Sequence, residues 1–168
     1  MLKLMTIESP LGTLRLVERD DELAGVYLPE QAVPELPGAG RTPLLARVAA
    51  QLAEYFAGER REFELPIAPR GSGFQELVWR ALGAIPYAET RSYGELARAI
   101  ARPAASRAVG SANSKNPISI ILPCHRVIAA NGQLTGYAGG MAAKRWLLDH
   151  ERRYSQCPHA PSSFATVF

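Results

Sequence analysis

The segment from Pro66 to Gly73 divides the chain into two halves of different character and constrains the fold more than any other feature. It holds two prolines and two glycines within eight residues, a composition that interrupts helices and strands. Before it, as far as Leu28, short apolar stretches alternate with turn residues, which is typical of an antiparallel meander. After it, apolar residues recur mostly at helical spacing.

The two halves predict an α/β N-terminal subdomain, a small antiparallel sheet plus one helix, followed by a mainly α C-terminal subdomain. A proline- and glycine-rich loop is expected over 29–43 with no regular element, and a helix over 45–56. A chain of 168 residues suits one ordinary domain or two small ones that share a core. The predicted N-terminal subdomain, linker, C-terminal subdomain and tail occupy residues 1–66, 67–73, 74–152 and 153–168.

Composition excludes several classes of protein. No apolar run approaches the roughly 18 residues of a membrane span, and the first residues do not form a signal-peptide core. The two cysteines, Cys124 and Cys157, are too few for a disulfide framework, and neither belongs to a Cys-x-x-Cys pair that would indicate zinc. We therefore expect a soluble, cytoplasmic protein without a metal or a cofactor, and we assign Cys157 no role.

Basic residues are concentrated between Arg91 and Arg126. Six basic residues against Glu95 alone give this stretch a local charge of +5, in a chain whose net charge is only +3. A surface of this kind favours a polyanion such as nucleic acid as its partner.

The same basic stretch predicts two short helices. Ser92 opens the first with a Ser-x-x-Glu capping box, and Pro103 is placed to be the first residue of the second, which runs to about Ser114. Two short helices joined by a tight turn indicate a helix-turn-helix, although a helical hairpin inside a core has the same pattern.

The apolar residues 118–122 predict a buried strand that stops at Pro123. Cys124 would then lie at the end of a rigid element, in a position to react. His125 supplies a titratable base, and Arg126 favours the thiolate over the thiol. Because adjacent residues of a strand point to opposite faces, a turn or a bridging water has to link Cys124 to His125. The alternative is that Cys124 is a small buried hydrophobe, which is the commoner fate of a lone cysteine.

Two further elements complete the predicted C-terminal half. Asn131 and Gly132 indicate a hairpin turn that places residues 127–129 opposite Leu134. A last helix is expected from Met141 to about His150, and residues 152–168 show no periodicity and predict a loosely docked tail.

Several blocks of sequence, in order along residues 73–151, resemble the O6-alkylguanine-DNA alkyltransferase family, the methylated-DNA–protein-cysteine methyltransferases. These blocks are residues 74–79, 85–87, 90–93, 106–110, 116–117, 123–127 and 144–148. The resemblance implies the compact, monomeric, metal-free bacterial form. It also implies DNA repair by direct, stoichiometric (suicide) transfer of the alkyl group from O6-alkylguanine, and from O4-alkylthymine, to Cys124 after base flipping.

The resemblance implies a role for each matching residue. Cys124 is the nucleophile, His125 acts on it through a water, and Glu151 orients His125. Asn116 ties the helix-turn-helix to the active-site segment. Tyr93 favours rotation of the damaged nucleotide and donates a proton to the departing guanine.

The resemblance also implies how DNA is bound. Arg107, on the second helix, fills the space that the flipped base leaves, and this helix enters the minor groove without sequence preference. The other residues expected at the DNA are Tyr93, Arg102, Ser106 and Ala108, and those expected around the alkylguanine are Val127, Tyr137, Ala138 and Gly139.

Two positions depart from the family pattern, and two other functions remain as alternatives. Ala138 stands where many members have serine, and Ala88 stands where glycine is usual. A non-catalytic protein that binds alkylated DNA is one alternative, although such relatives replace the reactive cysteine that this chain retains. A Cys-His hydrolase is the other, but it would leave Glu151 and the basic helices without a role.

Overall fold

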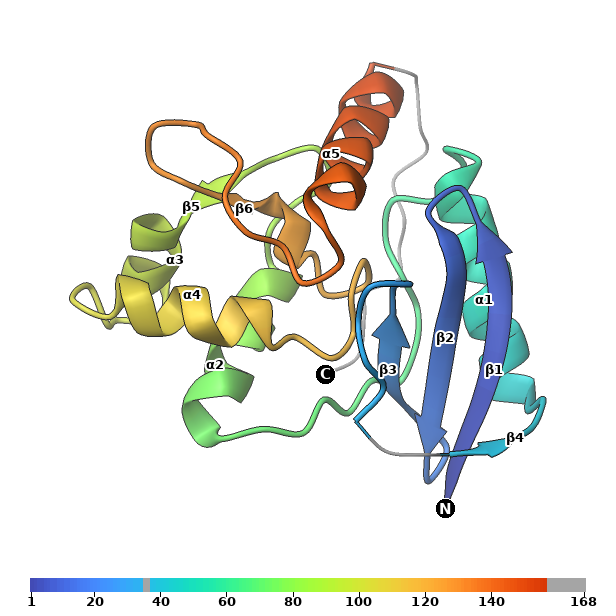
Figure 1. Ribbon diagram of the computed structural model, residues 1–168. Coiled ribbons are helices and arrows are strands. Elements are labelled where there is room, and N and C mark those ends of the chain that lie inside the picture. Colours follow the sequence, from blue (N-terminus) through green and yellow to red (C-terminus); the bar gives the residue numbers. More distant parts are fainter. Residues whose placement is uncertain (35–36, 157–168) are drawn as a thin grey trace.

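The computed structural model describes residues 1–34 and 37–156, and within them the two predicted halves lie side by side (Figure 1). Strands β1 (Leu2–Ser9), β2 (Gly12–Arg19) and β3 (Glu22–Tyr27) form the predicted antiparallel meander. Asp20 and Asp21 both have positive φ, 51° and 66°, as a tight turn between β2 and β3 requires.

The sheet has a fourth strand that the sequence did not predict. Gly38–Ala39 forms β4, which pairs in parallel with β1 at the edge of the sheet, in the order β3-β2-β1-β4. The prediction that residues 29–43 hold no regular element was therefore wrong, and the small sheet, predicted to be antiparallel, also contains one parallel pairing. The outer edge of β1 has backbone N–H and C=O groups that β2 does not pair. The glycine-rich loop runs along this edge and pairs with Lys3 and Leu4 there.

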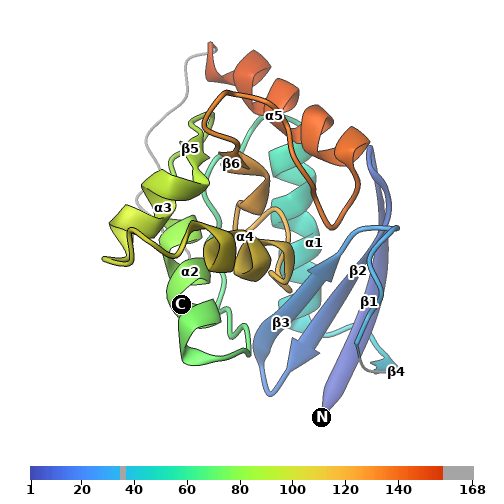
Figure 2. The ribbon, with the colours of Figure 1, turned by 60° about the vertical axis from the view of Figure 1, so that its left-hand side comes forward.

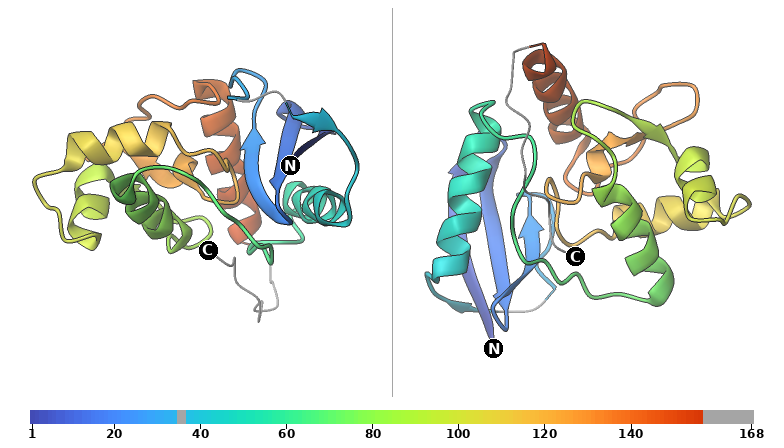
Figure 3. Two further views of the ribbon diagram at one scale, coloured as in Figure 1. Left: turned by 90° about the horizontal axis from the view of Figure 1, so that it is seen from below. Right: turned by 180° about the vertical axis from the view of Figure 1, so that it is seen from behind.

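Helix α1 (Pro43–Phe56) covers one face of this sheet (Figure 3). Thr42 caps its first turn by accepting a hydrogen bond from the Leu45 amide, and Pro43 stands at its first position. Gly58, with φ of +79°, follows the helix end, as predicted. The buried stripe of the helix consists of Leu45, Val48, Gln51, Leu52 and Tyr55.

The predicted linker is attached to the sheet. The Leu23 amide of β3 donates to the Pro66 carbonyl at 2.8 Å, and the Ala68 amide donates to the Leu23 carbonyl at 2.9 Å. The chain then reaches α2 (Gly73–Gly83), which begins with a capping box formed by Ser72 and Gln75.

Helices α3 (Tyr93–Ala99) and α4 (Ser106–Ser114) pack against each other as a helix-turn-helix would require, and they lie on the opposite side of the molecule from α1 (Figure 1). The capping box of Ser92 and Glu95 opens α3 as predicted. The second helix starts later than Pro103, because residues 102–105 form a turn closed by a hydrogen bond from the Ala105 amide to the Arg102 carbonyl.

The strand predicted over residues 118–122 does not form. Ile118 makes one isolated bridge to Val26 of β3, and the chain then folds into tight turns. Ile120 at the centre of these turns has φ of +72°, a conformation that a β-branched residue rarely adopts. Cys124–Arg126 follows as a short 3-10 helix, η1.

The segment after η1 also differs from the prediction. Val127–Ile128 forms β6, which pairs in parallel with β5 (Arg91–Ser92) rather than with Leu134. The turn at Gly132 does form, closed by a bond of 2.9 Å from its amide to the Ala129 carbonyl, but no strand follows it.

The last helix is longer than predicted. Helix α5 (Met141–Ser155) continues well past His150 and runs across one end of the molecule (Figure 2). The prediction that residues 152–155 belong to a tail was wrong, because Tyr154 packs on the ring of His150, with 4.8 Å between the centroids, and its carbonyl accepts a hydrogen bond from Arg61. Cys157 and the rest of the predicted tail lie outside the described residues.

One hydrophobic cluster joins both halves. It contains Leu16 and Val26 from the sheet, Leu52 from α1, and Leu122 and Leu147 from the C-terminal half, all at most 1% exposed. The packing of the two halves therefore fixes where residues 118–126 lie relative to α1. Among the described residues, none of the helices combines the length and the apolar character that crossing a membrane requires.

Replacing Ser92 by alanine tests the capping box that fixes the start of α3. Loss of the cap leaves the Glu95 amide without its bond to Ser92, so we expect the free energy of unfolding to fall by about 1 kcal/mol. Urea denaturation followed by circular dichroism measures this. Ser111→Ala, at an exposed position of α4, is the control, and an equal loss in both variants would contradict the role of the cap.

Candidate active site

Cys124 lies at the start of η1 and is only 4% exposed. Its amide donates to the Leu122 carbonyl at 2.8 Å, so the turn after Ile120 fixes the cysteine backbone. Asn116, itself buried, holds the same turn: its side-chain amide donates to the Leu122 carbonyl at 2.8 Å and its side-chain oxygen accepts from the Ile118 amide at 3.0 Å.

Burial raises the pKa of the Cys124 thiol, and three neighbours oppose this effect. These are Asn116, Tyr137 and the ammonium group of Lys144. The sequence predicted that Arg126 would favour the thiolate, but Arg126 binds Glu151 instead, and Lys144 is the cation that acts on the sulfur. Cys124 is therefore a protonated thiol at rest, and reaction requires a base.

His125 is the base that the geometry provides. Its side chain is fully buried, and its Nε2 lies 2.7 Å from Oε2 of Glu151. Because Glu151 is an anion that only accepts, Nε2 carries the hydrogen and Nδ1 is left with a free lone pair. Nδ1 is buried without a protein partner. Burial lowers the pKa of His125, so the ring is neutral and able to take a proton.

Glu151 is the centre of a buried network. Arg126 binds it with two bonds, from Nε to Oε1 at 2.8 Å and from an Nη nitrogen to Oε2 at 2.9 Å. The Tyr55 hydroxyl donates to Oε2 at 2.6 Å, and the Ala88 amide donates to Oε1 at 3.2 Å. Although burial opposes it, interaction with His125 and Arg126 holds the pKa of Glu151 well below its usual range.

Ala88 explains one departure from the family pattern. Its φ of +63° is in the left-handed region, where glycine is the usual residue. The conformation directs the Ala88 amide toward Glu151.

Lys144 holds the segment that connects η1 to α5. It is fully buried, and its ammonium group donates to the Val127 carbonyl at 2.7 Å and to the Thr135 carbonyl at 3.0 Å. The hydroxyl of Tyr93, at the start of α3, lies 3.2 Å from that of Thr135. Lys144 thus connects α5 to the residues on either side of the Gly132 turn, one of which contacts Tyr93.

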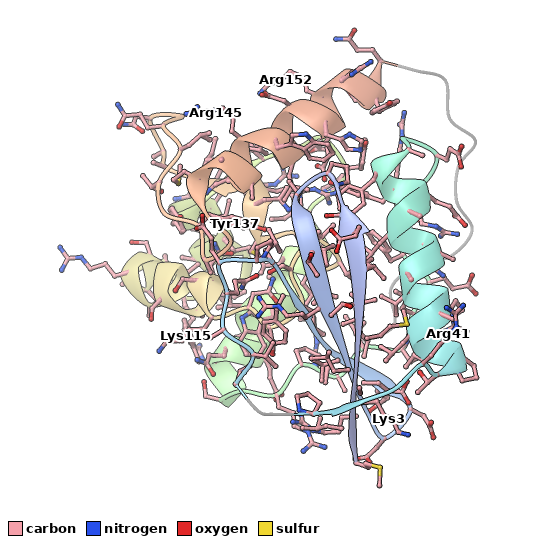
Figure 4. All side chains as sticks on the ribbon, turned by 45° about the vertical axis from the view of Figure 1, so that its right-hand side comes forward. Lys3, Arg41, Lys115, Tyr137, Arg145 and Arg152 are labelled. Carbon is pink, nitrogen blue, oxygen red and sulfur yellow. The ribbon has the colours of Figure 1, made fainter. Side chains whose placement is uncertain are left out.

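The four residues expected around the alkylguanine differ in how close they come to Cys124. Val127 is buried next to η1, and the hydroxyl of Tyr137 is buried without a hydrogen-bond partner and interacts with Cys124. Tyr137 lies near the N-terminal end of α5, between the sheet and the helical half (Figure 4). Gly139 packs tightly on Leu28, where a Cβ would approach to 2.6 Å. Ala138 is exposed and lines a hollow beside Asn116.

The residues expected at the DNA lie on α4, in the turn before it and at the start of α3. Arg107 and Ala108 are exposed on α4, Arg102 is exposed in the turn before it, and Ser106 is half-buried. The ring of Tyr93 faces Gly110 of α4, where an added Cβ would lie 3.6 Å from it. The opposite side of α4 is anchored, because the Trp79 indole donates to the Ala112 carbonyl at 2.8 Å.

Three residues of this site were not predicted from the sequence. Tyr55 fits the apolar stripe of α1, and Lys144 was noted only as part of a family block. Asn113 of α4 lies 3.4 Å from the Cys124 carbonyl through its side-chain nitrogen. The sequence signal for a buried Lys144 was its position, three residues before Leu147 on the stripe that α5 buries. In residues 1–34 and 37–156, no three His, Cys, Asp or Glu side chains lie close enough together to hold a metal ion.

Family models match both halves of the chain. The model for the 6-O-methylguanine DNA methyltransferase DNA binding domain matches residues 73–153, and the model for the ribonuclease-like domain of the same family matches residues 2–69.

Individual relatives agree with these matches. The chain is 50% identical over 157 residues to a methylated-DNA–protein-cysteine methyltransferase of Mycolicibacterium paratuberculosis, an alignment that covers 92% of this chain and 95% of the relative. It is 45% identical over 154 residues to the constitutive one of Bacillus subtilis, with 88% and 93% covered. The crystal structure of Mycobacterium tuberculosis OGT in complex with DNA superposes with a TM-score of 0.81 at 47% identity, covering 91% of this chain and 93% of that one.

The chain therefore belongs to the 6-O-methylguanine DNA methyltransferase family, as its sequence motifs predicted.

Replacing Glu151 by glutamine tests the buried network. The change leaves the Arg126 charge buried without its counter-ion, so we expect the free energy of unfolding to fall by about 3–5 kcal/mol. Chemical denaturation measures this loss. Asp149→Asn on the same helix removes an exposed ion pair with Arg152 and should change stability by less than about 1 kcal/mol. Similar losses of unfolding free energy in the two variants would show that the buried Glu151–Arg126 pair stabilises the protein no more than an exposed pair.

Proposed function

We propose that this protein repairs DNA directly, by transferring the alkyl group of O6-alkylguanine, and of O4-alkylthymine, to its own Cys124. The observation that carries the proposal is the buried Cys124 thiol next to the His125–Glu151 pair, beneath a helix pair with exposed basic residues. The family of the chain and the similarity to a relative crystallised with DNA support DNA as the partner.

The geometry supports the following mechanism. The neutral Nδ1 of His125 accepts the thiol proton through a water, and the Glu151 carboxylate stabilises the resulting imidazolium. The thiolate attacks the alkyl carbon, a carbon–sulfur bond forms, and the bond between that carbon and O6 breaks. The Tyr93 hydroxyl donates a proton to the guanine, which leaves as a neutral base.

The product is a thioether on Cys124, and the reaction is a single turnover. Thioethers resist hydrolysis, so the alkyl group stays on the sulfur. Each molecule is therefore consumed by one lesion. The retained Cys124 argues against the alternative of a protein that only binds alkylated DNA.

We further propose how the lesion reaches Cys124. The protein, acting as a monomer, places α4 in the minor groove, where small residues such as Ala108 allow close approach. Arg107 replaces the flipped base in the stack. The sugar-phosphate backbone of the DNA is contacted by Arg102, Ser106 and Tyr93. Val127, Tyr137, Ala138 and Gly139 surround the extruded guanine.

Duplex DNA that carries radiolabelled O6-methylguanine tests the proposed reaction. We expect one equivalent of label to move to the protein and to remain there, because Cys124 forms a stable thioether. Cys124→Ala should abolish transfer, whereas Ser111→Ala should not. Binding without transfer would favour the lesion-binding alternative, and release of label with turnover would favour a hydrolase.

Replacing Arg107 by alanine separates base flipping from chemistry. We expect repair of duplex lesions to slow by about tenfold or more, since unstacking costs a few kcal/mol, while reaction with free O6-benzylguanine stays within about twofold. Rates of Cys124 alkylation measure both. Arg98→Ala removes an equal charge from α3 and should have the smaller effect on duplex repair. Equal losses on duplex and free base would refute the flipping role.

A further inference from the structure

Tyr55 connects the N-terminal half to the candidate active site. It lies on α1, is completely buried, and donates its hydroxyl hydrogen to Oε2 of Glu151 at 2.6 Å, across 96 positions of sequence. The contact is therefore made by a residue from the half of the protein that carries neither Cys124 nor the helices proposed to bind DNA.

The Tyr55 side chain is held rigidly. Its ring packs against Phe63, Tyr87 and His150, with ring centroids 5.7, 6.3 and 5.2 Å away. The Nε2 of His150 donates to the Tyr55 backbone carbonyl at 2.8 Å, which fixes α1 against α5. With its ring and backbone restrained, the hydroxyl has little freedom to leave Glu151.

The oxygen that Tyr55 binds is the one that His125 uses. Oε2 of Glu151 receives Tyr55 at 2.6 Å, His125 at 2.7 Å and an Nη nitrogen of Arg126 at 2.9 Å. A carboxylate oxygen that already accepts hydrogen bonds has less negative charge to offer the next donor. The Tyr55 hydroxyl therefore reduces the pull of Glu151 on the His125 ring.

Tyr55 remains the donor and Glu151 the acceptor of their hydrogen bond over the pH range in which His125 takes up a proton. Burial raises the pKa of Tyr55 well above its usual value, so the phenol stays protonated, and the low pKa of Glu151 keeps the carboxylate an acceptor. The charged groups that act on His125 are Glu151 and Lys144 from α5 and Arg126 from η1. Tyr55 acts on His125 only through Glu151.

We propose that Tyr55 is a positioning residue of the alkyl-transfer reaction: its hydroxyl holds the Glu151 carboxylate in the orientation that His125 needs and weakens the basicity of Oε2 toward the His125 ring. The N-terminal half would then contribute to the reactivity of Cys124 and not only to packing. This inference rests on the proposed function.

Tyr55→Phe, which keeps the ring and removes the hydroxyl, tests the proposal. The rate of Cys124 alkylation by free O6-benzylguanine is measured against pH, after the wild-type protein has been shown to take up one equivalent of alkyl group. The wild-type rate should fall on the acid side below pH 6.5, because burial lowers the pKa of His125 from that value. In Tyr55→Phe the freed Oε2 attracts the imidazolium more strongly, so the acid limb should move up by about half a pH unit. The plateau rate should fall by about tenfold, because Glu151 loses the hydrogen bond that holds its carboxylate in the orientation that His125 needs.

Tyr87→Phe is the matched control. Tyr87 packs on the Tyr55 ring, but its buried hydroxyl has no hydrogen-bond partner, so its removal should leave the acid limb where it is in the wild type. A Tyr55→Phe profile that coincides with that of Tyr87→Phe would overturn the proposal. A slower plateau with an unchanged acid limb would also overturn it, because a purely structural disturbance predicts that result.

Site-specific 3-fluorotyrosine at position 55 provides a test of opposite sign that does not remove the hydroxyl. Its phenol is a stronger donor, so the acid limb should move to lower pH. A shift to higher pH, or no shift, would contradict the proposal even if Tyr55→Phe failed to fold. Failure of the proposed function would look different, because the wild-type protein would then take up no alkyl group at all. Failure of the Tyr55 proposal would leave wild-type uptake intact and change only the comparison of the pH profiles.

Discussion

The buried pairing of Glu151 with Arg126 is the interaction on which the rest of the site depends. Two charges removed from water are stable only when nearly every donor and acceptor is satisfied. Here the donors come from separate parts of the chain: Arg126 from η1, Tyr55 from α1, and the Ala88 amide from the turn after α2. Satisfying one carboxylate thus fixes the relative positions of α1, η1 and α5. His125 takes its orientation from Oε2 of the same carboxylate. The contacts that stabilise the fold therefore also set the geometry of the proposed base.

This arrangement suggests how a nucleophilic cysteine can stay unreactive until its substrate arrives. Many reactive cysteines have a low pKa and are exposed. Cys124 has a raised pKa and is almost fully buried, with Lys144 only partly offsetting the effect of burial. A thiol of this kind resists oxidation and adventitious electrophiles. The proton leaves only when His125 can accept it, and that suits a protein whose every molecule would be consumed by one reaction.

The sequence predicted the elements whose signals are local. The capping box at Ser92, the helical stripe of α1 and the meander of β1 to β3 all formed, because neighbouring residues determine them. Non-local contacts decided the rest. β4 exists because the edge of β1 is open, and residues 118–122 form turns instead of a strand because only Ile118 pairs with β3. Of the site, the motif around Cys124 and the partner Glu151 were recognisable by resemblance. Tyr55 was not, since a tyrosine in a buried helical stripe looks like any core residue until the fold brings Glu151 to its hydroxyl.

The turn before Cys124 shows why that motif cannot lie on a simple strand. Ile120 in the left-handed conformation costs about 1–3 kcal/mol and persists only where surrounding contacts impose it. Asn116 supplies such contacts on both sides of the turn, to Ile118 and Leu122. An extended chain would have pointed Cys124 and His125 to opposite faces, whereas the turn and the short helix η1 let one residue approach Lys144 and the other Glu151. The strain at Ile120 is therefore the cost of placing a nucleophile and its proposed base at consecutive positions of the chain.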